Sequence, residues 1–511
     1  MHLTDIWKRN IEEYGPYPLL LFEGKEYTNI DCDEWSSRLA RVLVERGVRS
    51  GDRVVVTMPN GPEVIWAFSA VVKAGAVVVP VLPLLQAHEL RHILLDCQPK
   101  AVLTTEWLIS KVKEAAEGLL SSPQLFTLDE ADSPHSLFHT MKRTDGSAFS
   151  VPVGEEETAA LFYTSGTTGK PKGVLLTHRN LCSNAEHAAE IAKRLPVHTK
   201  RVSLGVLPFS HAFGFTMMNV ALLLGEQVVL LPYFEPKKVL EAIERYQVAH
   251  TAMVPAMFHA LYHCPEADQY DTSSLIACVS GSASLPPQLA EAFERKFGCL
   301  ILEGYGLSEA APIVTATDPT KPVKRGSVGL PLPGVQVAVV DEHGNRLPPN
   351  EVGELIVSGP NVFHGYYGRE EESREVLRGG WLYTGDMARI DEDGYVFIVD
   401  RKKDVIIRGG FNIYPRDIEE LLMSHPDVLE AGVVGVPSPK MGEEVAAYVV
   451  VRRGAQVTEE ELIEFCQKRV AKYKSPRFLK KVGYLPKNII GKIDKKKLRE
   501  WASEFIPAVQ S

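Results

Sequence analysis

Residues 163 to 173 read YTSGTTGKPKG, a stretch with four serine or threonine hydroxyls, three glycines and two lysines. It directly follows the apolar run Ala159-Ala160-Leu161-Phe162. Glycine lets backbone N–H groups approach an anion closely, and lysine adds a positive charge, so this composition predicts a phosphate-binding loop. A solvated turn between two strands is the structural alternative.

The spacing of this stretch differs from that of the Walker loop. The Walker loop needs four residues between its first glycine and the Gly-Lys pair, and a Ser or Thr that opens a helix. Here only two threonines separate Gly166 from Gly169. Pro171 then follows Lys170, and proline disfavours helical geometry in the residue before it. The sequence therefore predicts a loop that covers a polyphosphate without standing at a helix N-terminus.

The size and composition of the chain are typical of a globular protein. Its 511 residues are 45% hydrophobic, enough to bury large cores, and a chain of this length has room for roughly two to four structural units. The formal net charge of −9 comes from 56 Lys and Arg against 65 Asp and Glu. This balance argues against a nucleic-acid partner, although a local basic patch stays open.

The cysteines and the apolar segments indicate the compartment. Seven cysteines, widely spaced and without a CxxC pair, indicate neither a disulfide framework nor a zinc ribbon. The N-terminal MHLTDIWKRNIEEYG lacks the basic and apolar regions of a signal peptide. The most apolar segment, AVVKAGAVVVPVLPLL from Ala70, is interrupted by Lys73, Pro80 and Pro83. We therefore expect a cytoplasmic protein without a signal peptide or a membrane-spanning helix.

Strand and helix patterns alternate through the first part of the chain. Apolar runs at 54–58 and 77–81 flank a helical pattern at 63–73, which is the order of a βαβ unit. The same alternation recurs downstream, with strands expected at 202–207, 228–231 and 277–280 and helices expected at 236–246 and 287–297. It predicts a layered α/β architecture with largely parallel sheets.

The pattern changes to strands and turns from about Gly326, and a boundary is expected within GYVFIVDRKKDVIIRGG at 394–410. Beyond it we expect a helix at 415–424, strands near 431–436 and 445–451, and a helix opened by Thr458 with Glu461 in a capping box. We therefore expect an α/β protein with a large N-terminal domain over residues 1–400, which includes a β-rich portion, and a small α+β C-terminal domain over residues 401–511.

Four further motifs accompany the loop: EGYGLSE (303–309), WLYTGD (381–386), DRKKD (400–404) followed by IIRGG, and PKNIIGKIDKK (486–496). In this order and at these separations the five motifs resemble the adenylate-forming superfamily, specifically the acyl-CoA synthetases that activate fatty acids. The resemblance extends over nearly the whole chain and includes GPNVFHGYY at 359–367.

The resemblance implies a two-step reaction. A carboxylate is a poor acyl donor, so ATP first converts it to an acyl adenylate, and a thiol then displaces AMP. The first step joins two anions and therefore needs positive charge and a metal to stabilise the departing pyrophosphate. The implied partners are a medium- to long-chain fatty acid, ATP and coenzyme A, with Mg²⁺ as the metal. Monomer and homodimer both stay open, as does a peripheral membrane contact.

The resemblance also assigns the nucleotide site. The loop would hold the β- and γ-phosphates through Thr164, Ser165, Gly166, Thr167, Thr168, Gly169 and Lys170. The segment of EGYGLSE formed by Glu303, Gly304, Tyr305, Gly306 and Ser308 would contact the nucleotide, with Tyr305 against adenine. A second adenine-contacting segment would be Gly281, Ser282 and Ala283. The structural alternative for EGYGLSE is a strand end that turns into a helix.

The metal and the ribose would bind charged groups. Glu309, with Thr164 nearby, would be the Mg²⁺ ligand because Mg²⁺ prefers hard oxygens and substrate phosphates. Asp386 would accept both ribose hydroxyls, and Arg401 would be a second ribose contact. An Asp before a loop commonly caps a turn, which is the alternative for Asp386.

The remaining assignments concern catalysis and the second step. Lys492 would bridge the substrate carboxylate and the α-phosphate, and Lys403 would be the hinge of a mobile C-terminal domain. After rotation that domain would present Gly409, Gly410 and Phe411 to the pantetheine of CoA. His211 would lie between the nucleotide and acyl pockets, although a lone histidine is more often structural. The charged run at 401–404 is otherwise typical of a solvated face.

The sequence is compatible with several functions. Within the superfamily they are an aryl or other carboxylate CoA ligase and a ligase that loads a carrier-protein thiol; outside it, a binding protein without catalysis. Malonate-activating members look similar overall but carry an arginine directly before the tyrosine of EGYGLSE. Gly304 occupies that position here and offers no charge to a second carboxylate.

Overall fold

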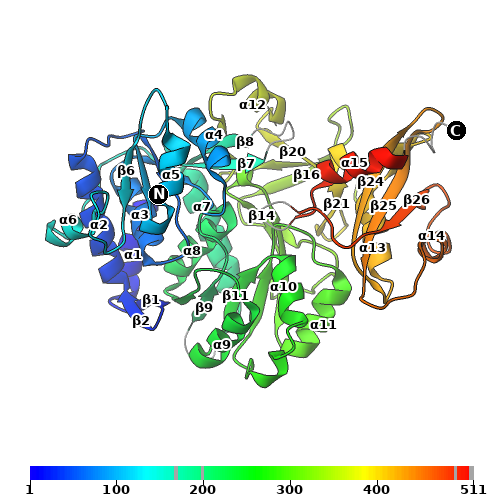
Figure 1. The fold of residues 1–511 in the computed structure, drawn as a ribbon, viewed down its shortest axis with the longest axis horizontal. Coiled ribbons are helices and arrows are strands. Elements are labelled where there is room, and N and C mark those ends of the chain that lie inside the picture. The colour runs from blue at the N-terminus through cyan, green and yellow to red at the C-terminus, as the bar shows by residue number, and fades with distance from the viewer. Residues whose placement is uncertain (166–170, 197–200, 488–491, 506–511) are drawn as a thin grey trace. The chain divides into compact units, whose positions relative to one another are not determined.

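The structure is a computed structural model that describes residues 1–165, 171–196, 201–487 and 492–505. Figure 1 shows the ribbon coloured from the N-terminus to the C-terminus. The chain divides into two compact units: residues 1–337 with 357–382 form the first, and residues 338–356 with 383–511 form the second. This division identifies compact bodies and does not identify a point of rotation, so the boundary at 400/401 and the hinge near Lys403 stay predictions.

One sheet of the first unit has seven strands in the order β18-β8-β7-β4-β3-β5-β6. β3 and β4 pair in parallel with helix α3 (Pro62–Lys73) between them, which confirms the predicted βαβ unit. β7, β8 and β18 pair antiparallel at one side of the sheet. The bounds are β3 (Arg53–Val56), β4 (Val77–Pro80), β5 (Ala101–Thr104), β6 (Gln124–Thr127), β7 (Thr158–Ser165), β8 (Pro171–Thr177) and β18 (Gly365–Tyr366).

A second sheet of this unit has nine strands in the order β15-β14-β13-β12-β11-β9-β10-β1-β2. The strands from β1 to β13 in that order are parallel, which confirms the predicted parallel α/β layer, and β2, β14 and β15 are antiparallel. The bounds are β1 (Pro18–Phe22), β2 (Lys25–Thr28), β9 (Val202–Gly205), β10 (Gln227–Leu230), β11 (His250–Met253), β12 (Ala277–Ser280), β13 (Leu300–Gly306), β14 (Ile313–Ala316) and β15 (Leu330–Pro331).

The helices of the first unit begin and end where local sequence favours it. α9 and α11 both open on proline, whose fixed φ suits a first helical turn, and both have the bounds predicted from sequence. α8 is apolar on nearly every face and is buried. The bounds are α1 (Leu3–Tyr14), α2 (Asn29–Glu45), α4 (Ala87–Cys97), α5 (Ile109–Ala116), α6 (Phe138–Arg143), α7 (His178–Ala192), α8 (Ala212–Leu224), α9 (Pro236–Tyr246), α10 (Pro255–Tyr262), α11 (Pro287–Phe297) and α12 (Glu370–Val376), with 3₁₀ turns η1 (Glu106–Leu108), η2 (Ala267–Gln269) and η3 (Ser308–Ala310).

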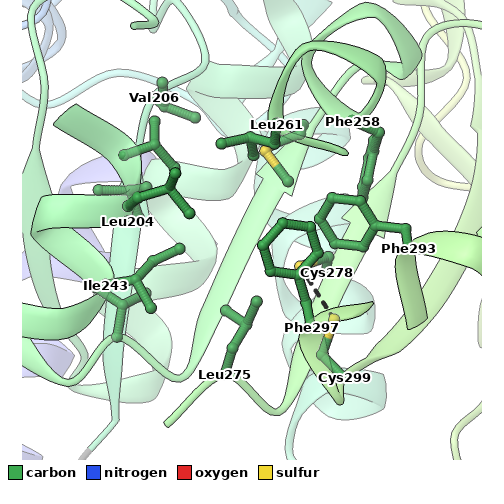
Figure 2. Close-up of a cluster of buried hydrophobic side chains, with 14 of the residues drawn as sticks. Leu204, Val206, Ile243, Phe258, Leu261, Leu275, Cys278, Phe293, Phe297 and Cys299 are labelled. Carbon is green, nitrogen blue, oxygen red and sulfur yellow. Dashed lines mark hydrogen bonds between the residues drawn. The ribbon is translucent and has the colours of Figure 1, made fainter. Parts of the chain in front are cut away.

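A large apolar cluster joins the nine-stranded sheet to α9, α10 and α11 (Figure 2). Phe293 meets Phe258 edge to face, with ring centroids 5.0 Å apart. The Sγ atoms of Cys278 and Cys299 lie 3.9 Å apart inside this cluster as free thiols. Such packing fixes the strands whose ends carry the predicted adenine segments.

A strand-rich region contains the points at which the chain passes between the units. Its sheet has the order β16-β17-β20-β19, and β21 pairs with β20. This confirms the change to strands predicted from about Gly326. The bounds are β16 (Gln336–Val340), β17 (Gly353–Ser358), β19 (Leu377–Arg378), β20 (Trp381–Ile390) and β21 (Val396–Arg401).

The second unit continues with a sheet in the order β23-β22-β25-β24, with β26 parallel to β25. The predicted capping box opens α14: the Thr458 hydroxyl accepts from the Glu461 N–H, and the Glu461 carboxylate accepts from the Thr458 N–H. The bounds are β22 (Ile406–Arg408), β23 (Phe411–Ile413), β24 (Val428–Ser438), β25 (Gly442–Val451), β26 (Phe478–Lys481), α13 (Pro415–Met423), α14 (Glu459–Gln467) and α15 (Lys495–Ala502), with η4 (Lys402–Asp404) and η5 (Ser503–Phe505). In the part of the chain that is described, no helix is long and apolar enough to cross a membrane.

Candidate active site

The opening stretch lies between the antiparallel strands β7 and β8. Thr164 pairs with Lys172 and Ser165 with Pro171 across this ladder. The next helix, α7, begins only after β8, at His178, and is capped by Thr177. The stretch therefore joins two strands and does not open a helix, as its spacing predicted. The predicted phosphate contacts Gly166, Thr167, Thr168, Gly169 and Lys170 lie outside the described residues.

The two predicted adenine segments lie at the same edge of the nine-stranded sheet, where the parallel strands end. β12 and β13 are parallel neighbours with Ser280 opposite Glu303. Gly281, Ser282 and Ala283 follow the end of β12 directly, while Gly304 and Tyr305 belong to the end of β13. Because parallel strands end at one edge, and ligands of open α/β sheets bind there, this arrangement suits the predicted nucleotide site.

The turn after Tyr305 depends on a glycine. A Cβ at Gly306 would lie 2.0 Å from the carbonyl oxygen of Pro312, so no other residue fits without moving the backbone. The backbone then makes the η3 turn, which contains Ser308 and Glu309. EGYGLSE is therefore a strand end followed by one short turn, and this local structure is compatible with either of its two interpretations.

The Glu309 carboxylate is held by a tyrosine. The hydroxyl of Tyr366 donates to Oε1 of Glu309 at 2.9 Å, and the N–H of Phe363 donates to the backbone oxygen of Glu309 at 2.9 Å. Burial, and after it the charge of Glu309, raises the pKa of the Tyr366 phenol, so the phenol keeps its proton. Tyr366 pairs with Val174 of β8, which places Glu309 beside the strand that follows the predicted phosphate loop.

The oxygen donors near β7 and β8 fit Mg²⁺. Mg²⁺ commonly binds one or two carboxylates together with substrate phosphates and does not need a protein cage. Glu309 supplies a carboxylate and Thr164 a hydroxyl. Among the residues that the structure describes there is no cluster of three or more His, Cys, Asp or Glu side chains suited to a metal.

His211 has an observed structural contact. It is the N-cap of α8, and its Nδ1 accepts from the N–H of Phe213 at 3.3 Å. The Phe213 ring in turn packs against Gly281, where an added Cβ would lie 3.0 Å from it. His211 therefore lies near the predicted adenine segment, and its part in an acyl pocket stays a prediction.

The second unit brings together Asp386, Arg401 and Lys492. Asp386 and Arg401 are opposite each other on β20 and β21, and Nε of Arg401 lies 2.8 Å from Oδ1 of Asp386. The Asp386 side chain is 3% exposed and the Arg401 side chain 52% exposed, so the pair presents its arginine to solvent. Burial, and after it the charge of Arg401, lowers the pKa of Lys492 to about 8, although Asp386 acts in the opposite direction.

The predicted hinge and CoA residues follow on the same unit. Lys403 is exposed in the η4 turn between β21 and β22, and the neighbouring Asp404 forms an ion pair with Arg499 of α15. Gly409 and Gly410 form the two-residue tip of the β22–β23 hairpin with φ values of 58° and 82°. Such positive φ values at both positions are typical of a tight hairpin turn and favour glycine. Phe411 follows, 56% exposed, with its ring stacked on Tyr473.

The sequence patterns give no role to Tyr366, whose hydroxyl contacts Glu309, or to Lys172, whose ammonium lies over the Tyr366 ring. Both lie inside motifs that the sequence singles out, GPNVFHGYY and the phosphate loop. The contacts of Tyr366 with Glu309 and with Lys172 join three segments far apart in the chain, and no periodicity or spacing reveals such contacts. The sequence feature that could have drawn attention to Tyr366 is the tyrosine pair at the end of GPNVFHGYY, a segment that resembles the family.

Comparisons with known proteins cover nearly the whole chain. The family model for the AMP-binding enzyme matches residues 7–367, and the model for the AMP-binding enzyme C-terminal domain matches residues 417–492. A long-chain-fatty-acid–CoA ligase of Bacillus subtilis (strain 168) is 38% identical, with 94% of this chain and 91% of the relative covered. A feruloyl-CoA synthase of an Amycolatopsis species is 37% identical, with 93% and 94% covered.

Among solved structures, the crystal structure of ATP-bound MatB from Rhodopseudomonas palustris has a TM-score of 0.91 and 32% identity, and the match covers 99% of this chain and 100% of that one. The motifs, the fold and these matches agree along nearly the full length of the sequence. The chain therefore belongs to the family of AMP-binding enzymes, the adenylate-forming superfamily that its five motifs resemble.

Proposed function

We propose that the protein is an AMP-forming, Mg²⁺-dependent acyl-CoA ligase whose acyl substrate is a fatty acid of medium to long chain. The observation that carries the chemistry is the grouping of Lys492 with Arg401 and Asp386 in one unit. The relative from Bacillus subtilis supports the fatty-acid substrate through its name and its 38% identity.

In the first step an oxygen of the fatty-acid carboxylate attacks the α-phosphorus of ATP, and the bond to pyrophosphate breaks. The ammonium of Lys492 neutralises the two approaching anions, which is the electrostatic stabilisation such a step requires. Asp386 and Arg401 orient the ribose. Mg²⁺ bound through Glu309 and Thr164 would supply the charge that stabilises the pyrophosphate.

In the second step the sulfur of coenzyme A attacks the acyl carbonyl carbon, and AMP leaves. Gly409 and Gly410 offer a backbone without side chains, and the exposed Phe411 offers an apolar surface to the pantetheine arm. We propose that the C-terminal domain rotates near Lys403 between the two steps. Lys492 would face the substrate in the first step, and this hairpin would face it in the second. A single domain would then serve both reactions with different faces.

A second candidate is an aryl-CoA ligase. It is favoured by the feruloyl-CoA synthase, which is 37% identical over 93% of this chain. The shared motifs bind the nucleotide in both kinds of enzyme, so they do not separate the two candidates.

The test is pyrophosphate release from ATP with palmitate, octanoate, ferulate or benzoate, each with and without CoA, and with the thioester identified by mass spectrometry. We expect the fatty acids to give the highest kcat/KM and to give acyl-CoA in equal amount to pyrophosphate. Higher values for ferulate or benzoate would favour the aryl ligase. Pyrophosphate without acyl-CoA would indicate another thiol acceptor, and no pyrophosphate with any acid would contradict the proposal.

A further inference from the structure

Tyr366 is fixed from several sides in the first unit. Its backbone pairs with Val174, and its ring meets the Phe363 ring edge to face with centroids 4.9 Å apart. The ammonium of Lys172 lies 5.2 Å from the centroid of the Tyr366 ring, a cation–π geometry. These contacts hold the phenol oxygen in a fixed position, 2.9 Å from Oε1 of Glu309.

Lys172 is itself fixed by a carboxylate. Its Nζ forms an ion pair with Glu372 at the start of α12, and its side chain is 14% exposed. Lys172 is also the ladder partner of Thr164. A continuous set of contacts therefore runs from Glu372 through Lys172 and Tyr366 to Glu309, beside the strand that carries Thr164.

One oxygen of the Glu309 carboxylate is occupied by this arrangement. A side-chain carboxylate is attached through rotatable bonds and can bind a cation through either oxygen or both. The hydrogen bond from Tyr366 fixes Oε1, and in the described part of the chain no other side chain donates to this carboxylate. A cation bound through the other oxygen would leave this hydrogen bond intact.

We propose that Tyr366 is a positioning residue that orients Glu309 toward a divalent cation bound with the nucleotide phosphates, with Lys172 and Glu372 holding the tyrosine ring. This inference rests on the proposed function, because it assigns Glu309 to the metal. Mutation of a hydrogen-bond partner of a metal ligand typically lowers metal affinity or activity by about 10- to 100-fold. In this role Tyr366 would change the affinity for the metal only by changing the orientation of Glu309.

The experiment compares Tyr366→Phe with Tyr367→Phe. Phenylalanine at 366 keeps the ring, its packing on Phe363 and its contact with Lys172, and removes only the hydroxyl. Tyr367 is the adjacent tyrosine, and its backbone N–H donates a hydrogen bond to the backbone oxygen of Gly173. Loss of the Tyr367 hydroxyl leaves this bond intact, so Tyr367→Phe is the matched control. Two quantities are measured: binding of Mn²⁺ in the presence of ATP, from the electron paramagnetic resonance signal of free Mn²⁺, and the Mg²⁺ concentration that half-activates pyrophosphate release.

We expect Tyr366→Phe to weaken Mn²⁺ binding and to raise the half-activating Mg²⁺ concentration by roughly 10-fold, as is usual for partners of metal ligands. Saturating Mg²⁺ should restore most of the rate, and Tyr367→Phe should behave as the parent. Glu309→Gln combined with Tyr366→Phe should bind Mn²⁺ no more weakly than Glu309→Gln alone, since residues that act through one another are not additive.

Two results would overturn the inference: unchanged Mn²⁺ binding in a folded Tyr366→Phe variant, or fully additive losses in the double variant. A failure of the proposed function looks different, because the parent enzyme would then release no pyrophosphate with any acid. The Mn²⁺ titration with ATP would still report whether Tyr366 acts on the cation.

Discussion

The Lys492 ammonium lies in the second unit within the field of a positive and a negative group, Arg401 and Asp386. If it neutralises the carboxylate and the α-phosphate, it serves the first step only. We predict that Lys492→Ala slows adenylate formation by roughly 100- to 1,000-fold, the usual cost of losing one electrostatic stabiliser. Conversion of a supplied acyl adenylate to the thioester should stay near the parental rate. Equal losses in both half-reactions would remove Lys492 from a role specific to the first step.

The pKa of Lys492 predicts a pH dependence as well. Burial lowers this pKa to about 8, so the ammonium loses its proton as the pH rises through that value. The active form is the protonated one, and kcat/KM for adenylation should therefore be flat below pH 8 and fall by about tenfold per unit above it. Lys492→Arg keeps its charge at these pH values and should lose this falling limb. A parental profile that stays flat to pH 10 would contradict the assignment.

Asp386 is the buried member of its pair and the predicted acceptor for the ribose hydroxyls. We predict that Asp386→Asn raises KM for ATP by roughly 10- to 100-fold, because a hydrogen bond to a charged acceptor contributes about 1.5–3 kcal/mol. The parent should discriminate against 2′-deoxy-ATP, and the variant should discriminate less. Glu392→Gln, an exposed substitution on the turn of the same hairpin, is the control. Unchanged discrimination in Asp386→Asn would leave Asp386 as a partner of Arg401 alone.

At the scale of elements, the η4 turn joins two strands of different sheets, β21 and β22. Lys403 stands in its middle, where a change of φ and ψ would redirect everything that follows. We predict that Lys403→Pro leaves pyrophosphate release nearly intact and lowers thioester formation at least tenfold, since proline fixes φ and restricts the preceding residue. Lys403→Ala removes the charge and keeps the backbone freedom, and it should resemble the parent. Thioester formation at the parental rate in Lys403→Pro would place the hinge elsewhere.

The elements also differ in how far their sequence determined them. α9 and α11 were predictable to the residue because each begins on a proline and has an apolar stripe at helical spacing. The capping box of α14 was predictable for the same local reason. The β7–β8 hairpin was open to two interpretations, because its polar stretch suits a phosphate loop or a solvated turn equally well at the level of local structure.

At the scale of the whole molecule, the question is which acid the enzyme accepts. Gly304 pairs with Ala316 inside the β13–β14 ladder and carries no charge. A second carboxylate in the acyl site would be desolvated without a partner from this position, at a cost of several kcal/mol. We predict that kcat/KM for malonate is at least 100-fold below the values for octanoate and palmitate. If malonate exceeds both fatty acids, an arginine from another segment supplies the charge, and the fatty-acid assignment is wrong.

The fold class follows from the sequence because the information for it is local. Apolar strands, helical stripes and prolines at helix starts repeat along the chain, and their alternation alone predicts parallel α/β layers. The family is recognisable from the sequence for the same reason, because each of the five motifs is a short run of residues. The resemblance also singled out Asp386 and Arg401 as ribose contacts from separate motifs, and the structure places them opposite each other on β20 and β21.

Only the tertiary structure decided which side chains support these motifs. Tyr366 contacts Glu309, which lies 57 positions earlier in the chain. Lys172 on β8 forms an ion pair with Glu372 on α12, which lies 200 positions later. The requirement for glycine at 306 comes from the carbonyl oxygen of Pro312, which lies 2.0 Å from where a Cβ would stand. Such contacts depend on how separate elements pack, and a one-dimensional pattern contains propensities and spacings but no distances between elements. The sequence therefore determined the family, whereas packing determined which side chains contact Glu309 and Tyr366.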